Sequence, residues 1–233
     1  MRKSAYWLSG AFLLTMLTSC GNSTTPKAVP DKEPLVDAVS WETKSVHAET
    51  LKKFKALVFD TLKVFYDYGS KAFSGKELTL QEAKLLPIGI EENYFGKLSG
   101  VYACGRFDID ENRLGLIART PSEYESSSVQ LFFFDKQKDQ FLPEYIQLGE
   151  VFGDAGDAFI KTSWLFRKDK KQLQALVYAY SSYNHEVEDT TDHTVDEWRE
   201  YALLDFSKPK TDTLSTNSKV LTKRFRKVLK GEI

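Results

Sequence analysis

The segment from His185 to Glu197 holds the residue types best able to do chemistry in this chain. Its sequence is HEVEDTTDHTVDE, which contains two of the three histidines and, if Glu200 is counted, seven carboxylates. Imidazole and carboxylate groups together suit zinc, manganese or iron, and carboxylates alone suit calcium. The candidate metal ligands are His185, Glu188, Asp189, Asp192 and His193.

The spacing within this segment favours a different interpretation. It matches no established metal motif, and neither histidine lies on a recognisable helix face. A metal site also needs ligands that surrounding groups hold in place, which a flexible loop lacks. We therefore favour a solvated acidic loop between two strands, with metal binding and acid–base catalysis as the alternatives.

Cys104 is a second candidate for chemistry, as a nucleophile. A nucleophilic cysteine needs a nearby base and a lowered pKa. No base accompanies Cys104 in the local sequence VYACGR, and His47, His185 and His193 are distant in the sequence. The pattern favours a buried cysteine within a strand.

Two acidic turns have oxygen ligands of the kind that divalent cations bind. Asp108–Asn112 begins like a calcium loop, but Arg113 stands where an EF-hand needs Gly and Arg119 where it needs Glu. We therefore expect a hairpin turn there. Gly153–Asp157 is expected to be a tight connection between strands, with a cation site as the alternative.

Aromatic side chains gather in the carboxyl half of the chain. An exposed row of rings would stack on sugars or bind a peptide. In a domain of this size, however, aromatic rings usually pack in the hydrophobic core. Alternation along a strand places Tyr178 and Tyr180 on one face and Tyr183 on the other. The rings concerned are Trp164, Tyr178, Tyr180, Tyr183 and Trp198.

Short apolar runs separated by polar turns predict a mainly antiparallel sheet of about seven strands. The runs Leu131–Phe134 and Ala175–Tyr180 are apolar on both faces, which predicts two central strands covered by another layer. The expected strands lie near 100–109, 114–120, 128–135, 143–149, 158–167, 173–183 and 197–206.

Helical periodicity flanks the predicted sheet, so the predicted fold class is α+β. Apolar residues three and four apart predict an N-terminal amphipathic helix over 45–68. Thr79 and Glu82 fit a capping box for a short helix over 79–86. A short basic helix is expected over 218–230, with its apolar side in the core; contact with anionic lipid or an acidic partner is its alternative role.

The first 20 residues, MRKSAYWLSGAFLLTMLTSC, have the features of a secretory signal. Two basic residues precede an apolar stretch that is shorter than the roughly 20 residues needed to span a bilayer. The motif Leu17-Thr18-Ser19-Cys20, followed by Gly21, resembles the lipobox of bacterial lipoprotein precursors.

This resemblance implies that Cys20 receives a thioether-linked diacylglycerol and that the Ser19–Cys20 bond is cut. The new amine would then be acylated, with palmitate as the typical fatty acid, so that the chain is anchored in a lipid bilayer. Because Gly21 rather than Asp follows the cysteine, the resemblance implies sorting to the outer membrane. An ordinary secretory leader with a chance cysteine and an uncleaved anchor are the alternatives.

Composition divides the rest of the chain into a tether and a folded body. Three prolines and many small polar residues between 21 and 40 cannot bury enough apolar surface to offset the entropy of ordering. We expect a lipoprotein signal peptide over 1–19, a lipidated, disordered tether over 20–40 and a single α+β domain over 41–233.

The composition of the 233-residue chain excludes several classes of protein. With 32 basic and 33 acidic side chains the net charge is −1, which gives no electrostatic case for nucleic-acid binding. Two cysteines cannot build a disulfide scaffold. The sequence lacks the motifs of serine hydrolases, phosphate-binding loops and zinc proteases, so it predicts no cofactor and no particular reaction.

The body from about Tyr94 to Ser207 resembles the small β-rich lipoproteins of unknown function in Gram-negative envelopes, through its general run of strands and turns. We therefore favour a non-enzymatic outer-membrane lipoprotein whose body binds an envelope protein, a peptide or a glycan. A periplasmic or surface hydrolase, metal-assisted through residues 185–197, is one alternative. An accessory subunit of an envelope complex is the other.

Overall fold

The computed structural model describes residues 42–68, 72–87, 100–122, 127–168 and 172–231. The chain divides into two units, Met1–Val36 and Asp37–Ile233, and every described residue belongs to the second. The expected signal peptide, the lipobox with Cys20 and the tether therefore lie outside the described residues.

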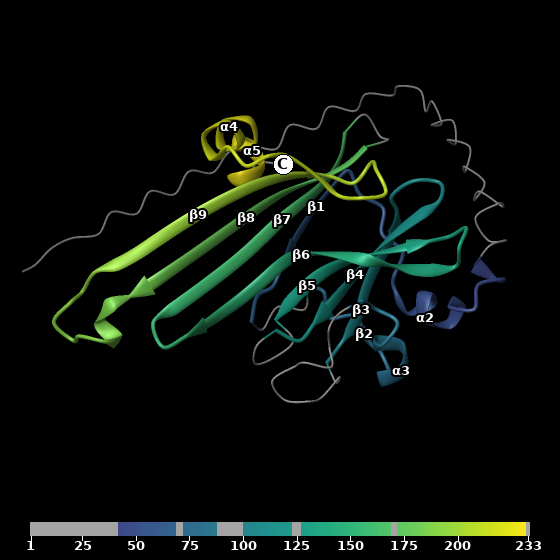
Figure 1. Cartoon of the computed structure of the whole chain (residues 1–233), viewed down its shortest axis with the longest axis horizontal. Coiled ribbons are helices and arrows are strands. Elements are labelled where there is room, and N and C mark those ends of the chain that lie inside the picture. Colours follow the sequence, from purple (N-terminus) through teal and green to yellow (C-terminus); the bar gives the residue numbers. More distant parts are fainter. Residues whose placement is uncertain (1–41, 69–71, 88–99, 123–126, 169–171, 232–233) are drawn as a thin grey trace, which may run out of the picture. The chain divides into compact units, whose positions relative to one another are not determined.

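An antiparallel sheet dominates the described part of the chain (Figure 1). Its strands follow the order β10-β9-β8-β7-β6-β5-β4-β3-β2, and β1 pairs with β7 off this path. The strands are β1 (Thr61–Phe65), β2 (Lys76–Glu77), β3 (Tyr102–Asp108), β4 (Arg113–Thr120), β5 (Ser128–Asp135), β6 (Gln140–Asp154), β7 (Asp157–Lys168), β8 (Gln172–Asn184), β9 (Val195–Asp205) and β10 (Asp212–Ser215). The helices are α2 (Ala48–Lys53), α3 (Leu80–Ala83), α4 (Ser218–Arg224) and α5 (Arg226–Leu229), with a 3₁₀ turn, η3 (His185–Val187), after β8.

The large antiparallel sheet and the few helices confirm the β-rich part of the predicted fold. All seven expected strands are present, as β3 to β9. The sheet is larger than predicted, with ten strands in the described residues, because it also contains β1, β2 and β10. These three strands have two to five residues each, which is too short for an alternating pattern to stand out.

The amphipathic helix predicted over 45–68 is wrong beyond its first turns. Helix α2 ends at Lys53, and from Thr61 the chain is extended and pairs with β7. Val58, which the helical spacing assigns to the apolar side, is fully exposed, whereas Val64 is fully buried. Pairing with a strand far away in the sequence outweighs the weak local preference for helix.

The other two helix predictions are confirmed in position. Thr79 caps α3 through the expected capping box with Glu82. The C-terminal helix is interrupted at Phe225 and so forms two pieces, α4 and α5, whose apolar side chains Leu221 and Phe225 are buried against the sheet. None of the helices in the described ranges is long and apolar enough to cross a membrane.

Three hydrophobic clusters hold the layers together. One lies between β3–β5 and the helices α2 and α3, and a second lies between β7–β9 and the helices α4 and α5. The third, here called the central cluster, joins β1, β3–β8 and the start of the segment after β9. Strand β5 is central, as predicted, because Phe132 belongs to the first cluster and Leu131 to the central cluster.

Gly149 marks the point where β6 changes partners. Residues 140–150 of β6 pair with β5, and Glu150–Asp154 pair with β7. A Cβ atom at Gly149 would lie 2.9 Å from the Cα of Phe65 in β1. Only glycine therefore lets β1 pass this close to β6.

Candidate functional site

A polar pocket of about 1030 Å³ opens beside the central cluster. The turn between β3 and β4, the turn between β5 and β6 and the segment after β9 line it. Five carboxylates and four cationic side chains face it, so it selects neither anions nor cations by charge. They are Asp108, Asp110, Glu111, Asp135 and Glu144, with Arg113, Lys136, Lys138 and Arg167.

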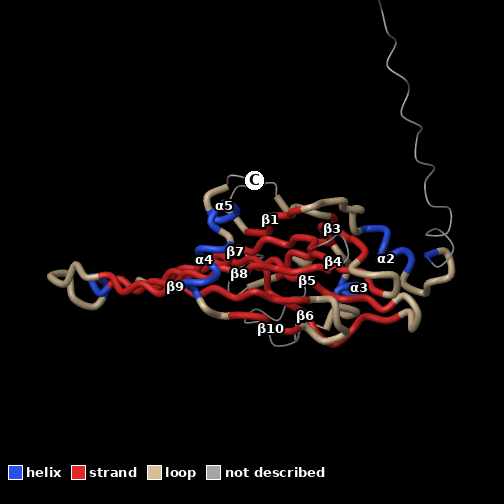
Figure 2. Tube along the Cα trace, turned by 90° about the horizontal axis from the view of Figure 1, so that it is seen from above, coloured by secondary structure: helices blue, strands red, loops and turns tan. Residues whose placement is uncertain are grey.

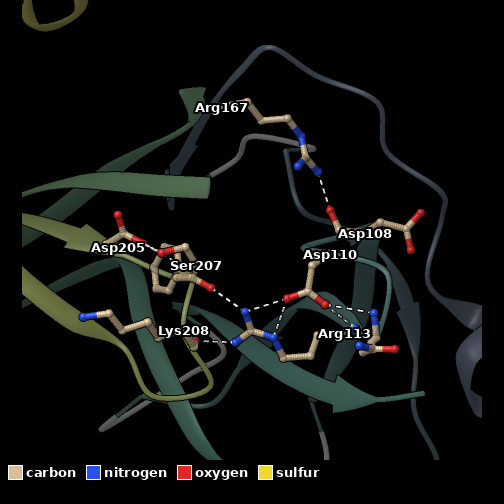
Figure 3. Close-up of polar contacts among 9 residues, drawn as sticks. Asp108, Asp110, Arg113, Arg167, Asp205, Ser207 and Lys208 are labelled. Atoms are coloured by element: carbon tan, nitrogen blue, oxygen red, sulfur yellow. Dashed lines mark hydrogen bonds and ion pairs between the residues drawn. The ribbon is translucent and has the colours of Figure 1, made fainter. Parts of the chain in front are cut away.

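Arg113 is the buried charge of this pocket (Figure 3). Its Nε donates to Asp110 Oδ2 at 2.7 Å, and its two terminal nitrogens donate to the backbone carbonyls of Phe206 and Lys208. These bonds fix the segment after β9 to the turn between β3 and β4. Burial alone would raise the pKa of Asp110, but hydrogen bonds from Arg113 and from the amide of Asn112 lower it overall.

Other charges of the pocket also pair with protein groups. Lys136 donates to the Asp108 carboxylate. Arg167 donates to the Asp108 backbone carbonyl (Figure 3). Asp108–Asn112 is the hairpin turn that the sequence predicts between β3 and β4. Because these groups bind one another, we assign the pocket a bracing role in the fold.

A second feature, here called the ribbon, comprises residues 150–161 of β6 and β7 and residues 178–201 of β8, β9 and their connection. These strand ends continue past α4 and α5 (Figures 1 and 2). Every residue from Tyr178 to Asn184 is only half-buried, and every residue from Val195 to Glu200 is exposed. Over most of its length the ribbon is therefore open on both faces in the described structure.

The register puts apolar and aromatic side chains on both faces of the ribbon. Ile160, Tyr180 and Arg199 are direct cross-strand neighbours on one face, with the Arg199 guanidinium 5.3 Å from the centre of the Tyr180 ring. Phe159 and Trp198 lie on the other face, one strand apart. Trp198 is 52% exposed and Ile160 is 41% exposed.

The sequence-based prediction for the aromatic rings holds for only part of the set. Trp164 is buried beside α4, as expected for core packing. Trp198 is exposed, as in the alternative of an exposed row, whereas Tyr178, Tyr180 and Tyr183 are half-buried and lie between the two predictions. Tyr178 and Tyr180 share a face and Tyr183 lies on the other, as strand alternation predicts.

Residues 185–197 form η3, an exposed connection and the start of β9. The two histidines pair with different carboxylates. His185 Nε2 lies 3.0 Å from Asp196 Oδ2, and His193 Nδ1 lies 3.4 Å from Glu186 Oε1. In the part of the chain that the structure describes, no three or more His, Cys, Asp or Glu side chains are grouped so as to hold a metal ion.

The other three candidate metal ligands also make their own contacts. Glu188 accepts a hydrogen bond of 2.6 Å from the Tyr183 hydroxyl. Asp189 and Asp192 each accept hydrogen bonds from the threonine two residues further on. The metal hypothesis for these residues stays a prediction.

The ribbon is strongly acidic. It holds ten carboxylates and two cationic side chains, a net charge of −8, whereas the whole chain has −1 and the remainder therefore +7. The carboxylates are Glu150, Asp154, Asp157, Glu186, Glu188, Asp189, Asp192, Asp196, Glu197 and Glu200, and the cations are Lys161 and Arg199. Gly153–Asp157 is the tight connection between β6 and β7 that the sequence predicts.

Cys104 lies in β3, as predicted, and is half-buried rather than fully buried. Its Sγ donates to the backbone carbonyl of Phe73 at 2.9 Å. Burial raises the pKa of the Cys104 thiol to about 11. The thiolate that nucleophilic chemistry requires is therefore scarce at neutral pH.

Replacing Asp196 by Asn should lower the pKa of His185, because the hydrogen bond to Asp196 raises that pKa above its usual range. Since folding raises the pKa, the contact stabilises the fold below the unfolded-state pKa, and this contribution is lost as the pH rises through the raised value. NMR titration of the His185 ring measures the change. Asp189→Asn is the matched control, because Asp189 does not contribute to the shift. An unchanged His185 pKa in the Asp196→Asn chain would contradict the contact.

Comparison of the chain with protein-family models, with curated proteins and with solved structures finds no match.

Proposed function

We propose that this chain is an outer-membrane lipoprotein, anchored through acylated Cys20, whose ribbon binds another protein of the cell envelope. The observation that supports binding is a sheet with apolar and aromatic side chains exposed on both faces. Tryptophan, tyrosine and arginine are the residue types that most often dominate binding energy at protein interfaces. The ribbon presents all three, as Trp198, Tyr180 and Arg199. The proposed function involves no catalysis and no cofactor.

The hydrophobic clusters of the body stabilise the ribbon in the unbound protein. Strands β7, β8 and β9 begin or end in the hydrophobic clusters, where Leu165, Leu176 and Leu203 are fully buried. A sheet of a few strands with no covered face is only marginally stable by itself. Anchoring in the body supplies that stability, so binding costs little additional ordering.

The expected tether over 20–40 suits a binding role. A flexible segment of this length has a root-mean-square span of about 25 Å. Acyl chains on Cys20 would hold its other end at the membrane. The ribbon would then search a thin layer next to the membrane, where the effective concentration of an envelope protein is high.

Photo-crosslinking in intact cells tests the proposed binding surface. A benzoylphenylalanine residue in place of Trp198 should give a protein adduct on illumination, because the exposed side chain at this position lies on the proposed binding surface. The matched control is the same residue in place of Val220 of α4, which is 54% exposed but outside the ribbon. The proposal is wrong if position 198 gives no protein adduct, which is the result expected for a glycan ligand. It is also wrong if position 220 gives the same adducts as position 198.

Changing Cys20 to Ser tests the proposed anchor. The unmodified chain should partition with outer-membrane vesicles, and its intact mass should exceed the mass of residues 20–233 by a diacylglyceryl group and a fatty acid. The Cys20→Ser chain should lose both the mass increase and the partitioning. Cys104→Ser is the control and should change neither. A chain of unmodified mass in the membrane fraction would rule out the anchor.

A further inference from the structure

The outer edge of β9 is open along Val195–Glu200, a segment here called the free edge. Strand β8 pairs with β9 along its whole length, from Val195 to Asp205. On the opposite side, β10 pairs only with Leu203–Asp205. Among the described residues no strand therefore pairs with the backbone of the free edge, which leaves its outward N–H and C=O groups available to an added strand.

The charge of the free edge determines what such a strand must carry. Asp196, Glu197 and Glu200 lie on it, against the single cation Arg199. The register places Glu197 on one face of the sheet and Asp196 and Glu200 on the other. Arg199 is itself paired with Glu197 at 2.7 Å. The face with Asp196 and Glu200 is thus net negative, whereas Glu197 and Arg199 cancel on the other face, within a ribbon of net charge −8.

A second copy of this chain is a poor occupant of the free edge. Edge-to-edge pairing of two copies would bring together two ribbons that each carry a net charge of −8, and this repulsion disfavours the pair. Charged side chains on an edge strand are a common protection against self-association. A positively charged strand would not experience this electrostatic repulsion.

We propose that the free edge receives an extended, lysine- or arginine-rich segment of the partner protein, which adds to the sheet as a further strand next to β9. This inference rests on the proposed function and specifies the chemistry of the partner. Backbone hydrogen bonds along Val195–Glu200 supply affinity, and basic side chains on one face of the added strand pair with Asp196 and Glu200.

A hollow at the body end of the free edge supports this arrangement. Its volume is about 570 Å³, and Phe159, Ala179, Glu200 and Ala202 are among its lining residues. All four lie on the face of the sheet that also carries Trp198. Lys161 also lines the hollow, with its ammonium nitrogen 5.3 Å from the centre of the Phe159 ring, so the hollow suits an uncharged side chain of the added strand rather than a second cation.

Peptide binding to the full-length chain in detergent micelles tests the inference. The probe is a fluorescent ten-residue peptide of alternating lysine and threonine, and fluorescence anisotropy measures its dissociation constant. Two control peptides separate charge from strand pairing. The first has glutamate in place of lysine, and the second keeps the lysines but carries N-methyl groups on alternate backbone amides. Both controls should bind at least about tenfold more weakly than the probe.

A charge-reversed variant completes the test. The double variant Glu197→Lys, Glu200→Lys should bind the lysine peptide about tenfold more weakly and should come to prefer the glutamate peptide. Glu49→Lys, Glu111→Lys is the matched control, because both carboxylates are exposed outside the ribbon, and it should keep the original preference. Equal binding of the N-methylated peptide, or an unchanged preference in the edge variant, would overturn strand addition at the free edge.

Crosslinking distinguishes failure of this inference from failure of the proposed function. If the adduct at position 198 persists unchanged in the Glu197→Lys, Glu200→Lys chain, the partner docks on a face of the ribbon and the basic-strand inference is wrong. If the adduct disappears in this chain but persists in the Glu49→Lys, Glu111→Lys chain, the inference is supported. Absence of any adduct in the otherwise unmodified chain would instead contradict the proposed function.

Discussion

Replacing Arg113 by Ala is expected to lower the free energy of unfolding by about 3 kcal/mol. The change removes the donor to the carbonyl oxygens of Phe206 and Lys208 and the cationic partner of Asp110. A buried acceptor that loses its hydrogen bond costs roughly 1–3 kcal/mol. Asp110 contributes less, because it is partly exposed and still accepts from two backbone amides.

Urea denaturation of the two chains measures this difference. Lys138→Ala is the matched control, since Lys138 lines the same pocket but is largely exposed, and its effect should stay below about 0.5 kcal/mol. Because folding lowers the pKa of Asp110, its carboxylate stabilises the native state above the unfolded-state pKa. That contribution is lost as the pH falls through the lower native pKa. The Arg113→Ala chain should therefore lose less stability on acidification, and an equal loss would contradict the bracing role.

Replacing Gly149 by Ala is expected to destabilise the fold by about 2 kcal/mol. The added Cβ would meet the Cα of Phe65 at 2.9 Å and its carbonyl carbon at 3.1 Å. These are backbone atoms of a paired strand, so no side-chain rotation relieves the contact. Strand β1 must shift instead, which disturbs its pairing with β7 and the packing of Val64 in the central cluster.

The matched control for this variant is Gly153→Ala in the same strand. There the nearest atom to an added Cβ is the carbonyl oxygen of Asp157, at 3.2 Å, and the position is exposed in the ribbon. Its effect on the free energy of unfolding should stay within about 0.5 kcal/mol. Equal effects of the two substitutions in urea denaturation would mean that the close approach of β1 to β6 does not constrain position 149.

The strands β3 to β9 are predictable because their signals are local. Leu131–Phe134 is apolar on both faces, and Asp110 begins a turn by accepting from the amide of Asn112 two residues later. The segment over 45–68 is different, because Leu62 and Phe65 fit a helical spacing although they lie in a strand. What decides between the two structures is the pairing with β7, which lies about 100 residues away.

The candidate site is only partly predictable for a similar reason. The alternation of side chains along a strand determines on which face of the sheet Tyr180 and Tyr183 lie. Their exposure depends instead on how far along β8 the helices α4 and α5 cover the sheet. Strand length is the one available signal, since β8 has 13 residues, whereas strands of about 5–6 residues are typical. The role of Arg113 has no local signal, because the carbonyls of Phe206 and Lys208 are 93 and 95 residues away in the sequence.

The pairing of β1 with β7 also sets an order of assembly. Strands β3 to β9 each pair with the next strand in the chain, so they can form as soon as both neighbours are present. Strand β1 is the exception, because Thr61–Phe65 must wait for Thr162–Phe166. Closing so long a loop costs conformational entropy, and the contacts that offset this cost exist only once β7 is part of the sheet. Strand β1 is therefore expected to pair with β7 last, after the central strands of the sheet have formed.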